Sequence, residues 1–220
     1  MRSARQQADS GSVSFGHQFA KPNDMTAREP RIILASASPR RAELLRQIRV
    51  EFELLPSQVE ERPHPDEAPA DYITRIARAK VIAVARQREA GLVIGADTVV
   101  VLDGRLIGKP EDEADARRLL RQLSGRWHAV MTGVALIDLE TRHEVADYDK
   151  TLVKFAQLTD TEIEWYAKTG EPMDKAGAYG IQGLGGLFID EIAGNYYNVV
   201  GLPIPLVYRL ARRLGYSFVR

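Results

Sequence analysis

The stretch LVIGADTVVVLDGRLIGKP, residues 92–110, constrains the fold more than any other part of the sequence. It begins as an apolar run typical of a buried strand, and the pair Asp103-Gly104 supplies a type I′ turn before a second strand-like run. We therefore expect a β-hairpin here. The other predicted strands and helices follow a mixed order instead of a regular alternation, which favours an α/β domain with a mixed sheet over a doubly wound parallel one.

Asp97 places a carboxylate inside the otherwise apolar first strand of this hairpin. An unpaired buried charge costs several kcal/mol or forces the group to take up a proton. One interpretation is structural: Asp97 satisfies backbone groups at a bulge next to Gly95. The other is functional: the carboxylate binds a hard cation such as Mg²⁺, accepts a proton from water, or does both.

The register of the hairpin predicts which side chains accompany Asp97. With a two-residue turn, Leu102 faces Arg105 and Thr98 faces Lys109. Lys109 would then return beside the corner formed by Asp97 and Thr98. We expect a cation, a carboxylate and a hydroxyl to cluster at one strand end.

The stretch ILASASPRRAELL, residues 33–45, predicts a strand followed by a helix. Ser38 can cap that helix and Pro39 fits its first position. Arg40 and Arg41 then place two cations where the helix already carries a partial positive charge. They are either two solvated arginines or, with the N–H groups of the helix start, an anion site for a polyphosphate.

A lysine lies on the apolar face of the helix predicted over residues 70–89. Lys80 could extend its stem along the edge of that face, or it could have a functional role inside. The apolar positions of the face are Ile73, Ile76, Ala77 and Val84.

The segment DKAGAYGIQGLGG, residues 174–186, holds five glycines in ten positions. It matches neither a Walker A sequence nor a dinucleotide fingerprint, but glycine at this density indicates tight turns or close approach of another group. Gln182 adds an amide that could match a pyrimidine edge. Tyr179, Tyr196 and Tyr197 could stack on a base or could belong to the core.

Two adjacent acids, Glu60 and Glu61, are the further candidates for a cation site. His64, His128 and His143 show neither the spacing of metal ligands nor the context of a catalytic triad. We expect these histidines at the surface or behind the site.

Composition excludes several classes of function. Thirty basic and thirty acidic residues give zero net charge, which argues against a nucleic acid partner. The chain has no cysteine, so disulfides and thiolate chemistry are excluded. No run reaches the roughly 20 apolar residues of a membrane span, and residues 1–24 lack the apolar core of a signal peptide. We expect a disordered leader at 1–24 and one cytoplasmic domain at 25–220.

Eight stretches together carry a family resemblance. In order they are ILASASPRR, VEE, ARAKV, GADTVVVLDG, GKP, LSGRWHAVMTGVAL, EPMDKAGAYGIQG and GNYYNVVGLP, and they extend from about residue 31 to the end. The chain resembles the Maf family of nucleoside triphosphate pyrophosphatases. This resemblance implies an elongated mixed α/β fold with two lobes around a cleft, shared with inosine triphosphate pyrophosphatases.

The resemblance also implies the reaction. It is hydrolysis between the α- and β-phosphates of a nucleoside triphosphate with a divalent cation, Mg²⁺ or Mn²⁺, for nucleotide-pool sanitation that includes modified pyrimidine nucleotides. A homodimer is suggested by the same resemblance. Asp97 matches the family's proton acceptor, with Lys80 and Lys109 as further catalytic residues and Ser36 and Arg41 as substrate-binding residues. Asp97 and Glu61 would serve the metal, with Glu60 as the alternative to Glu61.

Three positions are associated with substrate choice in this family. Here they are Arg40, Thr98 and Gln182, a pattern that resembles the subgroup acting on dTTP and UTP. The subgroup acting on 7-methyl-GTP carries Trp, Gln and Glu at these places. The alternative within the enzyme class is a 7-methyl-GTP pyrophosphatase. The alternative from another class is a non-catalytic nucleotide-binding regulator of cell division.

Overall fold

The computed structural model describes residues 31–219, so the predicted leader and the predicted domain start at residue 25 lie outside the described residues. The strands are β1 (Ile32–Leu34), β2 (Phe52–Leu54), β3 (Leu92–Leu102), β4 (Arg105–Ile107), β5 (Trp127–Asp138), β6 (Glu144–Phe155) and β7 (Ile189–Ala193). The α-helices are α1 (Pro39–Gln47), α2 (Pro69–Ala85), α3 (Glu113–Leu123), α4 (Asp160–Lys168), α5 (Tyr196–Val200) and α6 (Ile204–Arg213). Short 3₁₀ helices are η1 (Glu171–Asp174), η2 (Ala176–Ala178) and η3 (Leu184–Phe188).

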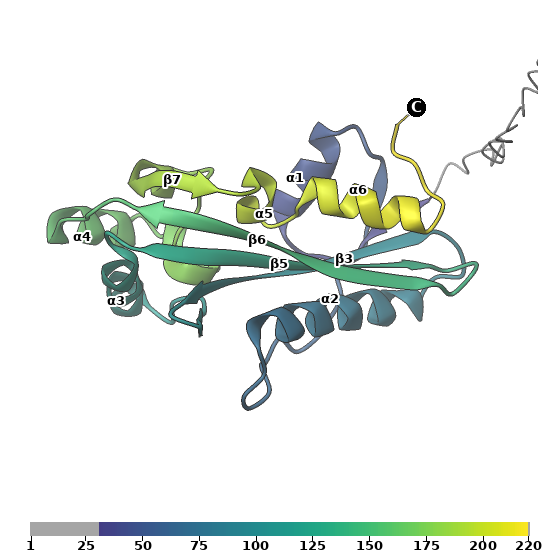
Figure 1. Cartoon of the computed structure of the whole chain (residues 1–220), viewed down its shortest axis with the longest axis horizontal. Coiled ribbons are helices and arrows are strands. Elements are labelled where there is room, and N and C mark those ends of the chain that lie inside the picture. The colour runs from purple at the N-terminus through teal and green to yellow at the C-terminus, as the bar shows by residue number, and fades with distance from the viewer. Residues whose placement is uncertain (1–30, 220) are drawn as a thin grey trace, which may run out of the picture.

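The strands form one mixed sheet, as predicted. Its order is β2-β1-β3-β5-β6-β7, and β4 also pairs with β3. β1 runs parallel to both β2 and β3, whereas the other pairs are antiparallel. Helix α2 lies against one face, and α1, α5 and α6 lie on the other (Figure 1).

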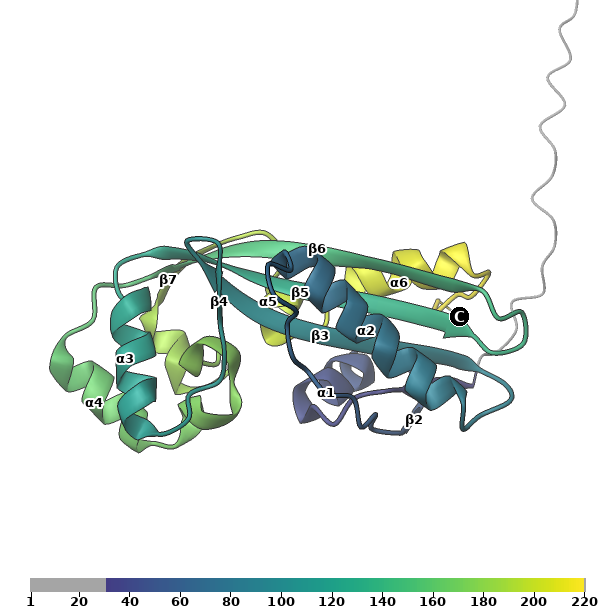
Figure 2. The ribbon, with the colours of Figure 1, turned by 90° about the horizontal axis from the view of Figure 1, so that it is seen from below.

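The molecule is elongated and has two lobes that share the long strands β3, β5 and β6 (Figures 1 and 2). Helices α1, α2 and α6 surround one end of these strands, and α3 and α4 lie at the other end (Figure 2). Separate apolar cores fill the two ends: one joins α1 and α6 to the sheet, and another joins α3 and α4 to it. The elongated two-lobed mixed α/β fold is thus confirmed. No helix within residues 31–219 has the length and apolar character needed to cross a membrane.

Two glycines of the central strands let α2 pack very close to the sheet. A Cβ atom at Gly95 would lie 2.8 Å from a methyl carbon of Val81 and 2.9 Å from the carbonyl oxygen of Ala77. One at Gly133 would lie 2.5 Å from the carbonyl oxygen of Ile73. Such separations are shorter than van der Waals contact, so both positions need glycine. The close approach brings the middle of α2 to the sheet surface.

The predicted hairpin forms, but it is shorter than expected. Leu102 pairs with Arg105 as predicted, and the pairing ends when Val100 meets Ile107. The predicted pairing of Thr98 with Lys109 is therefore wrong. The chain leaves the sheet at this point because the Gly108 carbonyl accepts a hydrogen bond from the Gly177 N–H at 2.9 Å, and Pro110 has no N–H to donate to a ladder.

Candidate active site

The site lies at a gap along one edge of β3. On this edge β1 pairs with β3 as far as Ile94, and β4 pairs with it again from Val100. No other strand of residues 31–219 pairs with this edge in between. The Ala96 carbonyl, at the gap, instead accepts hydrogen bonds from Arg41 Nη1 at 2.8 Å and Lys80 Nζ at 3.2 Å. Two cations thus take the place of a neighbouring strand.

Lys80 is buried against Asp97 and does not extend along the surface. Its Nζ atom donates to Asp97 Oδ1 at 2.8 Å and forms an ion pair with Glu61 Oε1 at 2.6 Å. The pairing of β3 with β5 runs without interruption through Asp97 and Gly133, so the bulge interpretation of Asp97 is wrong. Asp97 is a buried carboxylate that faces α2 and is held by its lysine.

The structure distinguishes between the two adjacent acids. Glu61 lines the pocket beside Lys80, whereas Glu60 pairs with Arg62 at 2.8 Å and is largely exposed. Partial burial opposes the ionisation of Glu61, but the hydrogen bond and charge of Lys80 outweigh it, with further help from Lys109 and Arg41, and hold the pKa of Glu61 below its usual value. Glu61 is therefore an anion beside Asp97.

Asp97 and Glu61 offer oxygen ligands that suit a hard divalent cation. Among the described residues, no group of three or more His, Cys, Asp or Glu side chains could hold a metal ion by itself. Mg²⁺ is commonly bound through one or two carboxylates, with water and substrate phosphates completing its shell. The residues present fit that kind of shared site and do not fit a cage made by the protein alone.

Arg41 is buried under the pocket and is held by four hydrogen bonds to neutral oxygen atoms. Its acceptors are Gly201 O at 2.8 Å, Ser36 Oγ at 3.1 Å, Ala96 O at 2.8 Å and Thr98 Oγ1 at 3.0 Å. Burial lowers the pKa of this guanidinium from its usual value, although the nearby carboxylates Asp97 and Glu61 oppose the shift. Arg41 therefore ties α1, β3 and the loop after α5 together, a role that the sequence did not indicate.

The start of α1 faces the pocket without an acidic residue in its first turn. Ser38 occupies the N-cap position, but its side chain makes no capping hydrogen bond, so the predicted cap is wrong. Its N–H instead donates to Ser36 Oγ at 3.2 Å. The Ser36 hydroxyl oxygen thus accepts hydrogen bonds from both the Ser38 N–H and Arg41 Nη1. The positive N-terminal end of α1 stays directed at the pocket.

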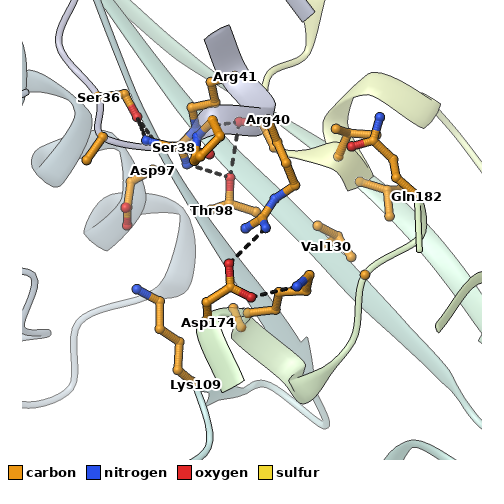
Figure 3. A pocket seen from close by; sticks show the side chains of 18 of the residues that line it. Ser36, Ser38, Arg40, Arg41, Asp97, Thr98, Lys109, Val130, Asp174 and Gln182 are labelled. Atoms are coloured by element: carbon orange, nitrogen blue, oxygen red, sulfur yellow. Dashed lines mark hydrogen bonds and ion pairs between the residues drawn. The ribbon is translucent and has the colours of Figure 1, made fainter. Parts of the chain in front are cut away.

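Arg40 points away from Arg41 and crosses the pocket. Its Nη1 atom donates to Asp174 Oδ2 at 3.1 Å, and Asp174 also accepts from Lys175 Nζ at 2.6 Å (Figure 3). Asp174 belongs to η1, so this ion pair joins the two lobes. Sequence reasoning missed Asp174, although an acid directly before a lysine and a glycine-rich segment was a visible signal.

Thr98 lies at the floor of the pocket and Gln182 at its rim. The Thr98 hydroxyl is half-buried and contacts Arg41 Nη2, Thr132 Oγ1 at 3.0 Å and Gly201 O at 3.4 Å. Gln182 is exposed at the rim. Thr98 therefore acts on the shape of the pocket floor, whereas Gln182 can meet a ligand.

The pocket has a volume of about 380 Å³ and receives side chains from both lobes. This volume is within the range of small-molecule sites. Figure 3 shows Asp97 and Lys109 on one side, Gln182 on the opposite side and Arg40 between them. Lys109 reaches the pocket although it lies beyond the end of β4. All of the predicted site residues except Glu60 line this pocket: Ser36, Arg40, Arg41, Glu61, Lys80, Asp97, Thr98, Lys109 and Gln182.

The aromatic candidates separate into core and surface. Tyr179 is buried, with its hydroxyl 2.7 Å from His128 Nε2 and its ring packed edge-on against Phe155. Tyr196 and Tyr197 are exposed on α5 and do not line the pocket. His128 is buried behind Tyr179, which lines the pocket, so the alternative that places this histidine behind the site is the correct one; burial lowers its pKa to about 4. His64 and His143 are exposed, as expected.

The family model described as Maf-like protein matches residues 31–214 of the chain. The chain belongs to the Maf family. Three relatives, each named dTTP/UTP pyrophosphatase, are similar over most of their length. The protein of Geobacter sulfurreducens is 51% identical over 84% of this chain and 97% of its own. That of Koribacter versatilis is 51% identical over 84% and 94%, and that of Symbiobacterium thermophilum is 47% identical over the same shares.

Among solved structures, the Ham1 protein of Staphylococcus aureus superposes on 57% of this chain and 72% of its own, with a TM-score of 0.43 and 16% identity. A similarity at this level carries no weight for either the fold or the function of this Maf-family chain.

Proposed function

We propose that this Maf-family protein hydrolyses dTTP and UTP to the nucleoside monophosphate and pyrophosphate. The observation that carries the proposal is the arrangement of one pocket, with the Lys80–Asp97 pair and Lys109 at one side and Arg40 and Gln182 away from them. Relatives at 47–51% identity that bear the name dTTP/UTP pyrophosphatase support the choice of substrate.

The cationic groups of the pocket would bind the triphosphate. This ligand carries about four negative charges near neutral pH, and charge-assisted hydrogen bonds from Lys and Arg are the strong ones. Lys109 is exposed in the pocket and free of the sheet ladder, so it can approach a phosphate. The start of α1 supplies a further positive end. Arg41 would act mainly by holding this start in place, because four of its donors are used within the protein.

Asp97 would take the proton of the attacking water. The water oxygen bonds to the α-phosphorus, the bond from that phosphorus to the α–β bridging oxygen breaks, and pyrophosphate leaves with the bridging oxygen. Lys80 holds Asp97 in one position through the 2.8 Å hydrogen bond. A divalent cation held by Asp97 and Glu61 would lower the pKa of the attacking water and offset phosphate charge. Mg²⁺ and Mn²⁺ are the candidates.

Gln182 and Arg40 would recognise the base. The Gln182 amide has both a donor and an acceptor, which matches a pyrimidine edge that offers a carbonyl and an N–H. Arg40 is fixed by Asp174 and is thereby directed away from Asp97. The proposed biological role is the removal of canonical and modified pyrimidine triphosphates from a cytoplasmic nucleotide pool, and a homodimer is proposed on the family resemblance.

The experiment is a measurement of pyrophosphate and monophosphate release across dTTP, UTP, CTP, ATP and 7-methyl-GTP, with Mg²⁺, with Mn²⁺ and with a chelator. We expect the highest kcat/KM for dTTP and UTP and no turnover with the chelator. Preference for 7-methyl-GTP, or saturable binding without monophosphate, would contradict the proposal in favour of one of the two alternatives.

A further inference from the structure

The carboxylate of Glu171, at the start of η1, lies under the glycine-rich segment that carries Gln182. Its Oε2 atom accepts the Leu184 N–H at 2.8 Å, and its Oε1 atom accepts the Gly185 N–H at 3.1 Å and the Tyr166 hydroxyl at 2.8 Å. One carboxylate therefore holds two successive backbone N–H groups just beyond Gln182.

Tyr166, on α4, holds the other side of the same segment. Its ring is fully buried, and its hydroxyl accepts the Gly180 N–H at 3.2 Å while donating to Glu171. The backbone is thus fixed two residues before Gln182 and two residues after it. A side chain between two fixed points has less conformational freedom to lose when it meets a ligand.

The glycines of this segment fit closely around the Glu171–Tyr166 pair. A Cβ atom at Gly185 would lie 2.5 Å from the Tyr166 hydroxyl oxygen, and one at Gly183 would collide with the Glu171 carboxylate. One at Gly180 would lie 2.6 Å from Cε of Lys175. The flexible end of Lys175 can move aside from Gly180, whereas the Tyr166 hydroxyl and the hydrogen-bonded Glu171 carboxylate are held in place, so Gly183 and Gly185 are the two positions at which the approach of protein side chains favours glycine.

We propose that Glu171 and Tyr166 are positioning residues for base recognition: their hydrogen bonds to segment 180–185 hold Gln182 at the rim of the pocket. This inference rests on the proposed function, because it takes Gln182 as the residue that meets the base. Neither residue lines the pocket itself, so both act through the segment.

The donors around Glu171 require an acceptor with no hydrogen of its own. Partial burial opposes its ionisation, but the N–H groups of Leu184 and Gly185 and the Tyr166 hydroxyl outweigh this and lower the pKa of Glu171. A glutamine at this position would turn an NH₂ group toward one of these donors. Glu171→Gln therefore conserves the shape of the side chain and removes one of its acceptor atoms.

The test compares kcat and KM for UTP and ATP in Glu171→Gln and Tyr166→Phe. We expect Glu171→Gln to lower the ratio of kcat/KM for UTP over ATP about tenfold, mainly through the KM for UTP, since a hydrogen bond to a charged group is lost. Tyr166→Phe should shift the ratio in the same direction by less. Glu164→Gln is the matched control, because this acid of α4 is exposed and forms its ion pair with Lys168 of the same helix.

The mechanism is tested in the Gln182→Ala background. There Glu171→Gln should change selectivity no further, because it acts through Gln182. Hydrogen exchange provides a readout that does not depend on activity: the amides of Leu184 and Gly185 should exchange faster in Glu171→Gln and at the wild-type rate in Glu164→Gln.

The outcomes separate this inference from the proposed function. A wild-type protein without pyrimidine preference would contradict the proposed function. The exchange measurement would still test whether Glu171 and Tyr166 hold segment 180–185 in place. Unchanged selectivity in Glu171→Gln, an equal further loss in the Gln182→Ala background, or unchanged exchange at Leu184 and Gly185 would each overturn the inference. If Glu171→Gln fails to fold, the same three measurements are made on Tyr166→Phe: the UTP over ATP ratio, that ratio in the Gln182→Ala background, and the amide exchange.

Discussion

The Nζ atom of Lys80 lies 2.8 Å from Oδ1 of Asp97, and both side chains are less than a tenth exposed. A buried ion pair of this kind is a weak source of stability, because the desolvation of two charges offsets their attraction. It does fix the orientation of the carboxylate. Asp97 can therefore stay in one place while a substrate is exchanged.

Asp97→Asn should abolish most of the turnover and leave the fold intact. Asparagine has the same shape as aspartate but cannot take up a proton from water, and a general base contributes about 10²- to 10⁴-fold to a rate. Pyrophosphate release measures the effect and circular dichroism checks the fold. Asp190→Asn, an exposed position in β7, is the control and should keep wild-type turnover. A folded Asp97→Asn protein with wild-type rates would show that Asp97 is not the base.

Lys80→Met should move the acid limb of the kcat/KM profile to higher pH. The hydrogen bond and charge of Lys80 hold the pKa of Glu61 below its usual value, so loss of the ammonium raises that pKa. It also removes the ammonium that pairs with both Asp97 and Glu61. The measurement is kcat/KM for UTP between pH 5 and 9. An acid limb at the same pH in wild type and variant would show that Lys80 does not set the charge of this site.

Gly133→Ala should destabilise the protein by about 1–3 kcal/mol, because the new methyl group meets the backbone of α2 and overpacks the interface. The displacement of α2 should also lower kcat, since α2 carries Lys80. Urea unfolding measures the stability. Gly108→Ala is the control for stability, because a Cβ at Gly108 meets no atom within 4 Å. Equal stability of the two variants would contradict the close packing of α2 on Gly133.

His128 should make folding stability depend on pH in the acid range. Burial lowers the pKa of His128 in the folded state to about 4, below the ordinary value of 6.5. Above pH 6.5 the imidazole is neutral in both the folded and the unfolded state, and His128 costs no stability. As the pH falls below 6.5, the unfolded state takes up a proton that the folded state does not, and the loss of folding stability reaches about 3 kcal/mol by pH 4. Urea unfolding at a series of pH values should show a flatter dependence for His128→Gln. His143→Gln, at an exposed histidine, should follow the wild type, and the same slope in all three proteins would argue against a neutral buried His128.

Arg40→Ala should weaken the binding of UTP more than its turnover. Arg40 is partly exposed and fixed by Asp174 toward the centre of the pocket, so its loss would remove the contact proposed with the nucleotide and leave Asp97 untouched. We expect an increase in KM for UTP of about tenfold with a smaller change in kcat. Arg46→Ala is the matched control, because Arg46 is an exposed arginine of the same helix outside the pocket. An equal effect of both substitutions would point to net charge alone.

Much of the fold and site could be predicted because the relevant signals are local. Asp97 stands out as a charge in an apolar strand, and Lys80 as a charge on an apolar helix face. Each breaks a local rule, and the structure shows that each compensates the other. The mixed sheet followed from the order of strands and helices in the same way.

The remaining features depend on contacts between distant segments. The sequence did not show that Arg41 would be surrounded by backbone and hydroxyl oxygens, because one of these acceptors is the Gly201 carbonyl far along the chain. The sequence predicts that His128 belongs to a strand, but it is the packing of Tyr179 and Phe155 against its ring that buries it. The early end of β4 depends on Gly177, which takes the Gly108 carbonyl out of the ladder.

The interrupted pairing along β3 has a consequence for solubility as well. An open strand edge is a template on which another copy of a chain can add a strand, and proteins avoid aggregation by blocking such edges with charge. Here the uncovered stretch is only a few residues long, and the Ala96 carbonyl within it is occupied by Arg41 and Lys80. The same two cations that border the pocket thus keep this opening in the sheet from becoming a site of edge-to-edge self-association.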